Sequence, residues 1–233
     1  MQELNPFRKF LQLLPGMVLL IMAMVPAFCC FSQEKPAYYK EVMAFKHQDS
    51  LRFPAKGQVL FIGSSSFTNW KDVQEYFPGV SILNRAFGGS SLIHLIYYQN
   101  VIIYPYQPAQ IVIYCGENDF AGDARLPADS VVYRFKKLFT DIRTRLPKVP
   151  IVYVCMKPSP ARKRMLAKYE VANFEIREYL RKQKKARYVD VYEAMLLPDR
   201  SPNGALFLSD SLHMNASGYK LWQGILKKSL KKK

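Results

Sequence analysis

Short apolar runs rich in β-branched and aromatic residues alternate along this chain with longer segments of helical periodicity. Five such runs predict strands, at residues 58–62, 80–84, 110–115, 150–156 and 186–191. Helical periodicity is found at residues 37–48, 68–77, 91–104, 128–146, 162–183 and from 215 or 216 to 232. Strands and helices that alternate in this way form βαβ units, so the pattern predicts an α/β protein with a parallel sheet covered on both faces.

The N-terminal pattern predicts export. Arg8 and Lys9 precede an uncharged apolar run at 10–31, and a polar stretch follows. We expect residues 1–32 to be a signal peptide or an N-terminal anchor, and residues 33–233 to form one domain. The predicted location is therefore periplasmic or extracellular.

Two kinds of membrane retention remain open at this stage. The apolar run is long enough to span a bilayer, but Pro15 and Pro26 disfavour a regular spanning helix. Cys29 and Cys30 would suit a lipid anchor, although Phe28 stands where such signals usually have a small residue. Any membrane association is expected through this segment.

The chain is strongly basic, with 34 Lys and Arg against 18 Asp and Glu and a formal net charge of +16. Part of the excess lies in the tail at 226–233, and the rest is scattered over the predicted helices. The basic residues do not interleave with aromatic residues on one face, as in a nucleic-acid platform. We interpret them as solvated helix faces first and as attraction to an anionic surface or polymer second, with no nucleic-acid partner.

The two cysteines outside the N-terminal segment, Cys115 and Cys155, lie near the ends of predicted strands. Buried thiols behave as small hydrophobic groups, and this is the favoured interpretation. A disulfide is the alternative, but neighbouring parallel strands rarely have the required geometry. Neither cysteine has the partners that a zinc site needs, and no metal or organic cofactor is expected.

Glycines and polar residues follow each predicted strand. The five stretches are 63–66, 84–90, 116–119, 157–160 and, after a loop, 210–213. In an open parallel sheet, ligands bind beyond the carboxyl ends of the strands. We therefore expect these stretches to surround one site.

The residue types at this edge supply the parts of an acyl-transfer site. Ser65 lies on the turn between a strand and a helix, where it could act as a nucleophile or merely cap the helix. His213 could serve as its base, and Asp210 could orient the imidazole. The backbone N–H groups of Ser65 and Gly89 and the side-chain amide of Asn118 are candidate donors to an oxyanion.

With these four blocks in order, the chain resembles the SGNH hydrolases, also called GDSL-type esterases and lipases. Ser65, Gly89, Asn118 and His213 match the family's block residues, and the resemblance covers residues 58–219. It is closest to the platelet-activating-factor acetylhydrolase-like and carbohydrate-esterase branch. The resemblance implies a flavodoxin-like, three-layer α/β/α fold around a five-stranded parallel sheet.

The serine block departs from the family pattern at one position. Ser64 stands where the Gly-Asp-Ser motif has an aspartate. Alignment on that motif makes Ser65 the nucleophile, and not Ser64 or Ser66. No Gly-x-Ser-x-Gly elbow is present, which disfavours the α/β-hydrolase fold.

The resulting hypothesis is an exported serine esterase that hydrolyses short-chain esters, acetyl esters above all, of a carbohydrate or a lipid. The catalytic residues would be Ser65, Asp210 and His213. One alternative is a non-catalytic, membrane-anchored protein that binds a glycan or lipid through its basic surface. Another is an acyltransferase that uses the same residues.

Other residues are assigned supporting roles. His47 and His94 are interpreted as structural, because neither lies at the strand-end edge in the predicted arrangement. Lys157 and Ser159 are expected to shape the rim of the pocket. We expect specificity to lie in loops 120–127, 159–164 and 197–208, where a sugar or a polar ester would suit the side chains of Phe120, Arg125, Arg162 and Phe207.

Overall fold

The computed structural model describes residues 35–232, and the predicted N-terminal segment at 1–32 lies outside them. Five parallel strands form one sheet in the order β2-β1-β3-β4-β5. They are β1 (Val59–Gly63), β2 (Ile82–Asn84), β3 (Gln110–Tyr114), β4 (Ile151–Val154) and β5 (Ala186–Val189). The five predicted strands and their parallel arrangement are confirmed.

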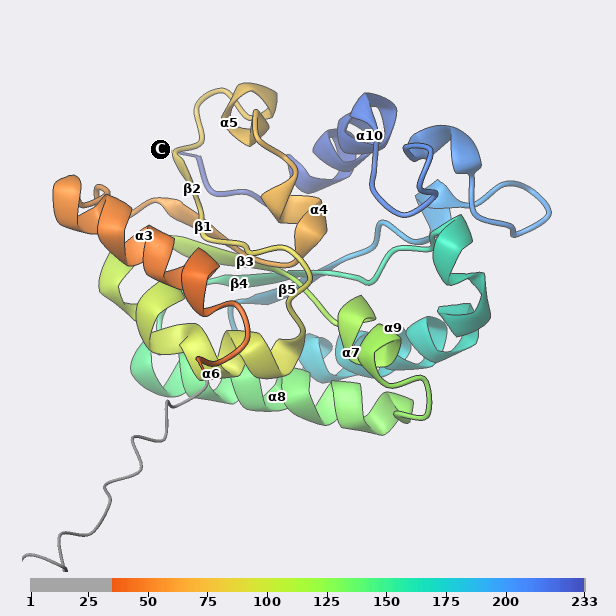
Figure 1. Cartoon of the computed structure of the whole chain (residues 1–233), viewed down its shortest axis with the longest axis horizontal. Helices are drawn as coiled ribbons and strands as arrows, with labels where there is room; N and C mark the ends of the chain where they lie inside the picture. The colour runs from red at the N-terminus through yellow and green to blue at the C-terminus, as the bar shows by residue number, and fades with distance from the viewer. Residues whose placement is uncertain (1–34, 233) are drawn as a thin grey trace, which may run out of the picture. The chain divides into compact units, whose positions relative to one another are not determined.

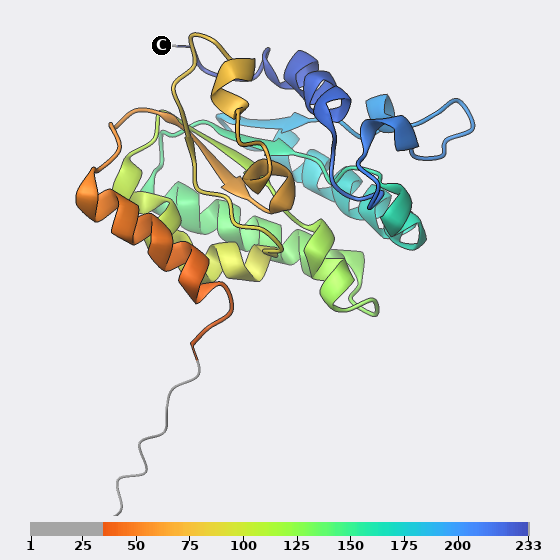
Figure 2. The same ribbon diagram turned by 45° about the horizontal axis from the view of Figure 1, so that its top comes forward.

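Helices cover both faces of the sheet (Figure 1). One face carries α3 (Tyr39–Leu51), α6 (Leu92–Ile102), α8 (Ala128–Arg145) and α9 (Leu166–Arg181). The other carries α4 (Ser65–Thr68), α5 (Val73–Tyr76) and α10 (Ala216–Leu226), which lie together in Figures 1 and 2. A short helix, α7 (Glu117–Gly122), follows β3, and 3₁₀ turns span Tyr104–Tyr106, Pro160–Met165, Glu193–Met195 and Gly204–Leu206. The three-layer α/β/α architecture is confirmed.

The central strands and the amphipathic α8 form the core. Every residue of β1 and β3 is buried, as expected for inner strands with helices on both sides. In α8, Val131, Phe135 and Ile142 repeat at helical spacing and are fully buried. Burial of one such side chain contributes about 1.5–3 kcal/mol, which makes this face the main source of α8 stability.

The prediction of one helix at 68–77 is wrong. The chain forms α4 and α5 instead, with Trp70 in the break between them. The Trp70 ring is fully buried and stacks on Tyr219 of α10, with 4.8 Å between ring centroids. This contact favours the break, because a large aromatic side chain gains more from burial than one helical turn gains from hydrogen bonds.

The last helix also ends earlier than predicted. It stops at Leu226 rather than at residue 232. The Gln110 side chain holds the following turn: its Nε2 donates to the Ser229 carbonyl at 2.8 Å, and its Oε1 accepts from the Lys231 N–H at 2.8 Å. Leu230 is buried beside this turn. The basic tail is therefore attached to the sheet through residue 231.

Cys115 and Cys155 are both buried and free, as favoured by the sequence. Burial raises the pKa of the Cys155 thiol to about 12, which keeps it in its unreactive, protonated form. Across residues 35–232, no helix combines the length and the apolar character needed to cross a bilayer.

Candidate active site

A glycine turn at the end of β1 places the three serines. Gly63 has φ +143, and a Cβ at this position would lie 1.9 Å from the carbonyl oxygen of Tyr114 in β3. Only glycine permits this close approach of two backbones. The Ser64 N–H donates to the same carbonyl at 3.0 Å. The chain then turns into α4, with Ser65 as its first residue.

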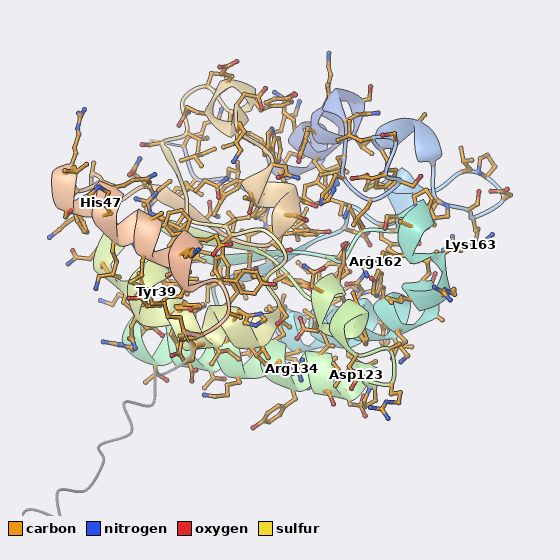
Figure 3. The ribbon with its side chains drawn as sticks, viewed as in Figure 1. Tyr39, His47, Asp123, Arg134, Arg162 and Lys163 are labelled. Atoms are coloured by element: carbon orange, nitrogen blue, oxygen red, sulfur yellow. The ribbon has the colours of Figure 1, made fainter. Side chains whose placement is uncertain are left out.

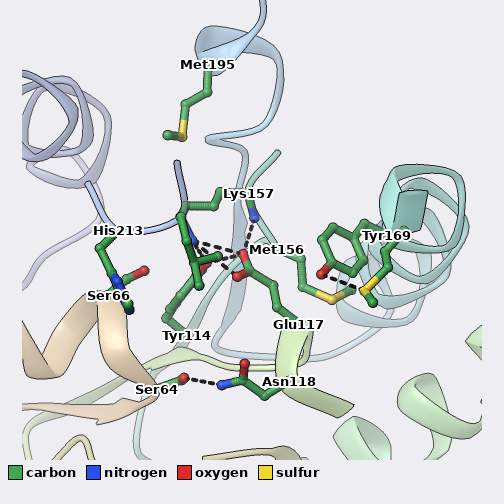
Figure 4. Close-up of polar contacts among 12 residues, drawn as sticks. Ser64, Ser66, Tyr114, Glu117, Asn118, Met156, Lys157, Tyr169, Met195 and His213 are labelled. Carbon is green, nitrogen blue, oxygen red and sulfur yellow. Dashed lines mark hydrogen bonds and ion pairs between the residues drawn. The ribbon is translucent and has the colours of Figure 1, made fainter. Parts of the chain in front are cut away.

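Only one of the three serine hydroxyls is both accessible and free. Ser64 is buried, and its Oγ accepts a hydrogen bond from Asn118 Nδ2 at 2.7 Å (Figure 4). Ser66 is 1% exposed. Ser65 is half-buried, and neither its hydroxyl nor its backbone N–H has a hydrogen-bond partner within residues 35–232. Ser65 is therefore the serine that a substrate can reach.

Asp210 and His213 form a preorganised pair. The Nδ1 of His213 lies 2.6 Å from Asp210 Oδ2, while the backbone N–H groups of Leu212 and His213 each donate to Asp210 Oδ1 at 2.9 Å. The backbone and side-chain hydrogen bonds from His213 lower the pKa of Asp210 to about 2. The carboxylate is ionised at neutral pH and orients the imidazole, whose Nε2 remains available.

The helix that follows His213, α10, contacts α4. Tyr219, early in α10, donates from its hydroxyl to the Ser66 carbonyl at 3.0 Å. Figure 4 shows His213 next to this end of α4. No hydrogen bond joins Ser65 to His213 in the part of the chain that the structure describes. Contacts of this kind often tighten only in the substrate complex, so the pairing of Ser65 with His213 as nucleophile and base stays a prediction.

The candidate oxyanion donors differ in their availability. The Gly89 N–H has no partner within the described residues, like that of Ser65. Asn118 Nδ2 donates to Ser64 Oγ at 2.7 Å and to the Ser90 carbonyl at 3.0 Å, so both of its hydrogens are in use. Asn118 can donate to an oxyanion only if its hydrogen bond to Ser64 Oγ breaks and one to the oxyanion replaces it.

A buried charged cluster surrounds Glu117, the residue before Asn118. Lys157 is fully buried, and its Nζ lies 3.2 Å from Glu117 Oε2. The other carboxylate oxygen of Glu117, Oε1, accepts a hydrogen bond from the Tyr114 hydroxyl. The Lys157 N–H donates to Glu117 Oε1 at 3.0 Å. Ser159 is buried too. The expectation that Lys157 and Ser159 form the pocket rim is therefore wrong: Lys157 compensates a buried carboxylate beneath the site.

A cavity of about 490 Å³ adjoins the candidate oxyanion donors and includes Gly89 and Asn118 in its wall. Ser65, Asp210 and His213 lie outside that wall. A second cavity, of about 870 Å³, lies before the amino ends of β3, β4 and β5 and contains none of these residues.

His94 also lines the cavity near the oxyanion donors, which corrects the expectation that it lies away from the strand-end edge. Its Nδ1 accepts from the Ser91 N–H at 3.1 Å in a capping box that starts α6. In the sequence, a serine followed three residues later by a side chain that can accept a hydrogen bond indicates a capping box, and this spacing could have placed His94 at the start of α6. Burial lowers the pKa of His94, which favours the neutral ring.

The specificity loops are placed only in part as expected. Loop 120–127 contributes Ala121, Gly122, Asp123 and Leu126 to the cavity, and loop 159–164 contributes Arg162. Loop 197–208 contributes nothing to this cavity. Of the four side chains expected near a substrate, Phe120 and Phe207 are buried and Arg125 is exposed elsewhere. Arg162 alone among them faces the cavity.

The acidic residues after β3 are already engaged. Asp119 is buried and pairs with Arg134 at 2.8 Å, and its other oxygen accepts from the Leu92 N–H at 2.9 Å. Over the described residues, no group of three or more His, Cys, Asp or Glu side chains is arranged to hold a metal ion.

Tyr38 is a functional candidate that the sequence pattern did not identify. It adopts φ +63, which is unusual for an aromatic residue, and donates from its hydroxyl to the Gly89 carbonyl at 2.8 Å. Its ring packs edge-on against His94 in the cavity wall. This contact fixes the peptide next to the Gly89 N–H.

We expect Tyr38→Phe to lower kcat on an acetyl ester about 3–10-fold with little change in KM, because it removes one hydrogen bond that orients Gly89. Steady-state kinetics measure this. Tyr98→Phe is the matched control, since the Tyr98 hydroxyl also donates to a backbone carbonyl, that of Ala37, at 2.8 Å. Equal kinetic losses in both variants would show that Tyr38 acts only through stability.

The sequence profile of the GDSL-like lipase/acylhydrolase family matches residues 59–221 of this chain. The match covers the strands, the glycine turn and the four blocks of polar residues described above. Among curated proteins, no sequence is similar enough to this chain to count as a relative.

Several solved structures share the fold. A protein from Streptococcus pneumonia, provisionally named a platelet activating factor, has a TM-score of 0.72 at 18% identity over 96% of this chain and 99% of its own. A GDSL-like lipase from Bacteroides thetaiotaomicron has a TM-score of 0.69 at 18% identity over 81% of this chain and 96% of its own. A catalytic mutant of an acetylxylan esterase from Geobacillus stearothermophilus has a TM-score of 0.60 at 12% identity over 77% of this chain and 97% of its own. At these identities the likeness establishes a common fold.

Proposed function

Because this chain belongs to the GDSL-like lipase/acylhydrolase family and is a carboxylic ester hydrolase, we propose that it is an exported serine esterase that removes short acyl groups, acetyl above all, from a carbohydrate or lipid alcohol. One observation carries the catalytic assignment. Ser65, whose hydroxyl is accessible and unbonded within residues 35–232, is the first residue of α4. The helix that follows His213, α10, contacts the next residue, Ser66, and His213 is held by Asp210 at 2.6 Å.

In this mechanism Ser65 Oγ attacks the ester carbonyl, and His213 Nε2 takes the hydroxyl proton. The tetrahedral intermediate places its oxyanion near the free N–H groups of Ser65 and Gly89. When the intermediate collapses, His213 returns the proton to the leaving alcohol and an acyl-Ser65 ester remains. Water activated by His213 then releases the acid and restores Ser65.

Each residue contributes a separate part of the rate. Removal of one oxyanion donor in comparable sites costs about 3–4 kcal/mol. Asp210 remains a carboxylate above about pH 2, so it stabilises the imidazolium throughout the neutral range. The Asn118 amide adds a third donor once the substrate displaces its contact with Ser64.

The cavity beside the oxyanion donors supports a polar leaving alcohol. Its wall contains only three aliphatic side chains, Ile93, Ala121 and Leu126, among charged and hydrogen-bonding groups. A long acyl chain would remove those polar groups from water without new hydrogen bonds, whereas a sugar can form hydrogen bonds with them through its hydroxyls. Export rests on the charge and apolar pattern at 8–31, which lies outside the described residues.

Purified protein is expected to hydrolyse p-nitrophenyl acetate and to lose activity steeply as the acyl chain lengthens from acetate to octanoate. A fluorophosphonate probe should label one serine, and peptide mapping should place the label on Ser65. A protein that binds substrate but neither turns it over nor accepts the label is the non-catalytic alternative. Acyl transfer to an added sugar that outruns hydrolysis identifies an acyltransferase.

A further inference from the structure

The charge of Arg162 is unpaired within residues 35–232. It lies in the 3₁₀ turn Pro160–Met165, where its φ/ψ of −110 and 15 interrupts the helical geometry. Its backbone N–H donates to the Ser159 carbonyl at 3.0 Å. The guanidinium is half-buried and makes no hydrogen bond or ion pair with residues 35–232. An arginine in such a position usually pairs with a carboxylate, because partial burial removes some of its hydration.

The guanidinium faces the cavity that contains the candidate oxyanion donors. Arg162 lines this cavity together with Gly89 and Asn118, whereas the neighbouring Lys163 does not and is exposed. Figure 3 shows Arg162 on the side of its turn toward α7 and Lys163 on the outer side. The two adjacent cations therefore have different surroundings.

The other ionisable groups of the cavity are compensated or neutral. Asp119 pairs with Arg134 at 2.8 Å. Asp123 is exposed and forms a surface pair with Arg125 at 3.6 Å. His94 favours its neutral form because burial lowers its pKa. Arg162 is the cation of this wall that forms no ion pair within the described residues, and it lies in the same wall as the donors that would hold the ester carbonyl.

We propose that the alcohol part of the substrate is a sugar that carries an anionic group, a carboxylate or a phosphate, and that Arg162 binds this group. The inference rests on the proposed esterase function and narrows its substrate class. A guanidinium presents parallel N–H donors that match two oxygens of either anion. The acetyl ester would then lie at Ser65 while the anion occupies the cavity, so Arg162 orients the leaving alcohol.

The test compares O-acetylated glucuronic acid, O-acetylated glucose 6-phosphate and O-acetylated glucose. We expect higher kcat/KM on at least one anionic sugar than on the neutral one. Arg162→Gln should lower kcat/KM on the preferred anionic sugar about 10–100-fold, as expected for loss of a charge-assisted hydrogen bond. The same variant should lower kcat/KM on the neutral sugar much less, by no more than about threefold, because only hydrogen bonds to hydroxyls are lost there. The relative losses on the uronic acid and the phosphate identify which anion is preferred.

Lys163→Gln is the matched control, since it makes the same charge change one residue away. It should cost less than about threefold, and raised salt should abolish that loss because the lysine is solvent-exposed. Equal losses in both variants, or equal losses of Arg162→Gln on anionic and neutral sugars, would overturn the assignment. Activity on p-nitrophenyl acetate without any anionic preference would also refute it and leave the esterase intact. Absence of all ester hydrolysis would instead reject the proposed function.

Discussion

Ser65→Ala is expected to lower kcat on p-nitrophenyl acetate by about 10⁴-fold or more, with little change in KM. The variant removes the only one of the three serine hydroxyls that is accessible and unbonded. It keeps the backbone N–H and the turn at Gly63, so the fold and the oxyanion donors are retained. Initial rates and fluorophosphonate labelling measure the loss, and circular dichroism checks that the variant is folded.

Ser64→Ala and Ser66→Ala are the matched controls for this prediction. Ser66 is buried, and its replacement should change kcat less than about threefold. Ser64→Ala frees one N–H of Asn118, which can then serve the oxyanion, so most of the activity should remain. If Ser64→Ala abolished labelling while Ser65→Ala retained it, the nucleophile would be Ser64.

His213→Ala is expected to lower kcat by about 10⁴-fold, because the serine hydroxyl loses its general base and the leaving alcohol its general acid. The side chain is partly accessible, at 27% exposed, so added imidazole should enter the space and restore part of the rate. Rescue by imidazole separates a catalytic role from a structural one. Stopped assays with and without imidazole at several pH values provide the measurement.

The chain offers two comparisons for this variant. His47→Ala removes an exposed histidine of α3 and should have no effect on kcat. Asp210→Asn keeps the shape of the pair but loses the carboxylate that receives three hydrogen bonds, so kcat should fall while imidazole gives no rescue. A His213→Ala enzyme that retained its rate would exclude His213 as the base.

The depressed pKa of Asp210 also affects folding. The pKa of Asp210 in the folded chain, about 2, lies below the ordinary aspartate pKa. Its hydrogen bonds therefore stabilise the folded chain fully at any pH above that ordinary pKa. That contribution is lost as the pH falls toward 2. Because Asp210 is exposed, the stabilisation is small and the carboxylate acts mainly on the orientation of His213.

Local sequence was sufficient for the architecture and for the blocks of the site. The strand-length apolar runs, the α8 periodicity of Val131, Phe135 and Ile142, and the polar turns after each strand are all determined by residues close together in the chain. The helices between consecutive strands make the strands parallel. Because parallel strands end at the same edge of the sheet, the polar turns that follow them lie at that edge. For this reason the fold was predictable, as was the contact of Asn118 with the serine turn at Ser64, whereas the pairing of Ser65 with His213 stays a prediction.

Burial and charge pairing depend instead on residues that are distant in sequence. The break at Trp70 follows from its stacking on Tyr219, and the end of α10 from hydrogen bonds with Gln110, which is 119 residues before Ser229. Lys157 is buried because Glu117 is there to neutralise it, whereas Arg162 has no ion-pair partner in the part of the chain that the structure describes. Residues close in sequence do not determine which carboxylate lies next to a given cation after folding. Only the tertiary structure could therefore distinguish Lys157, which pairs with a buried carboxylate, from Arg162, which we propose binds a ligand.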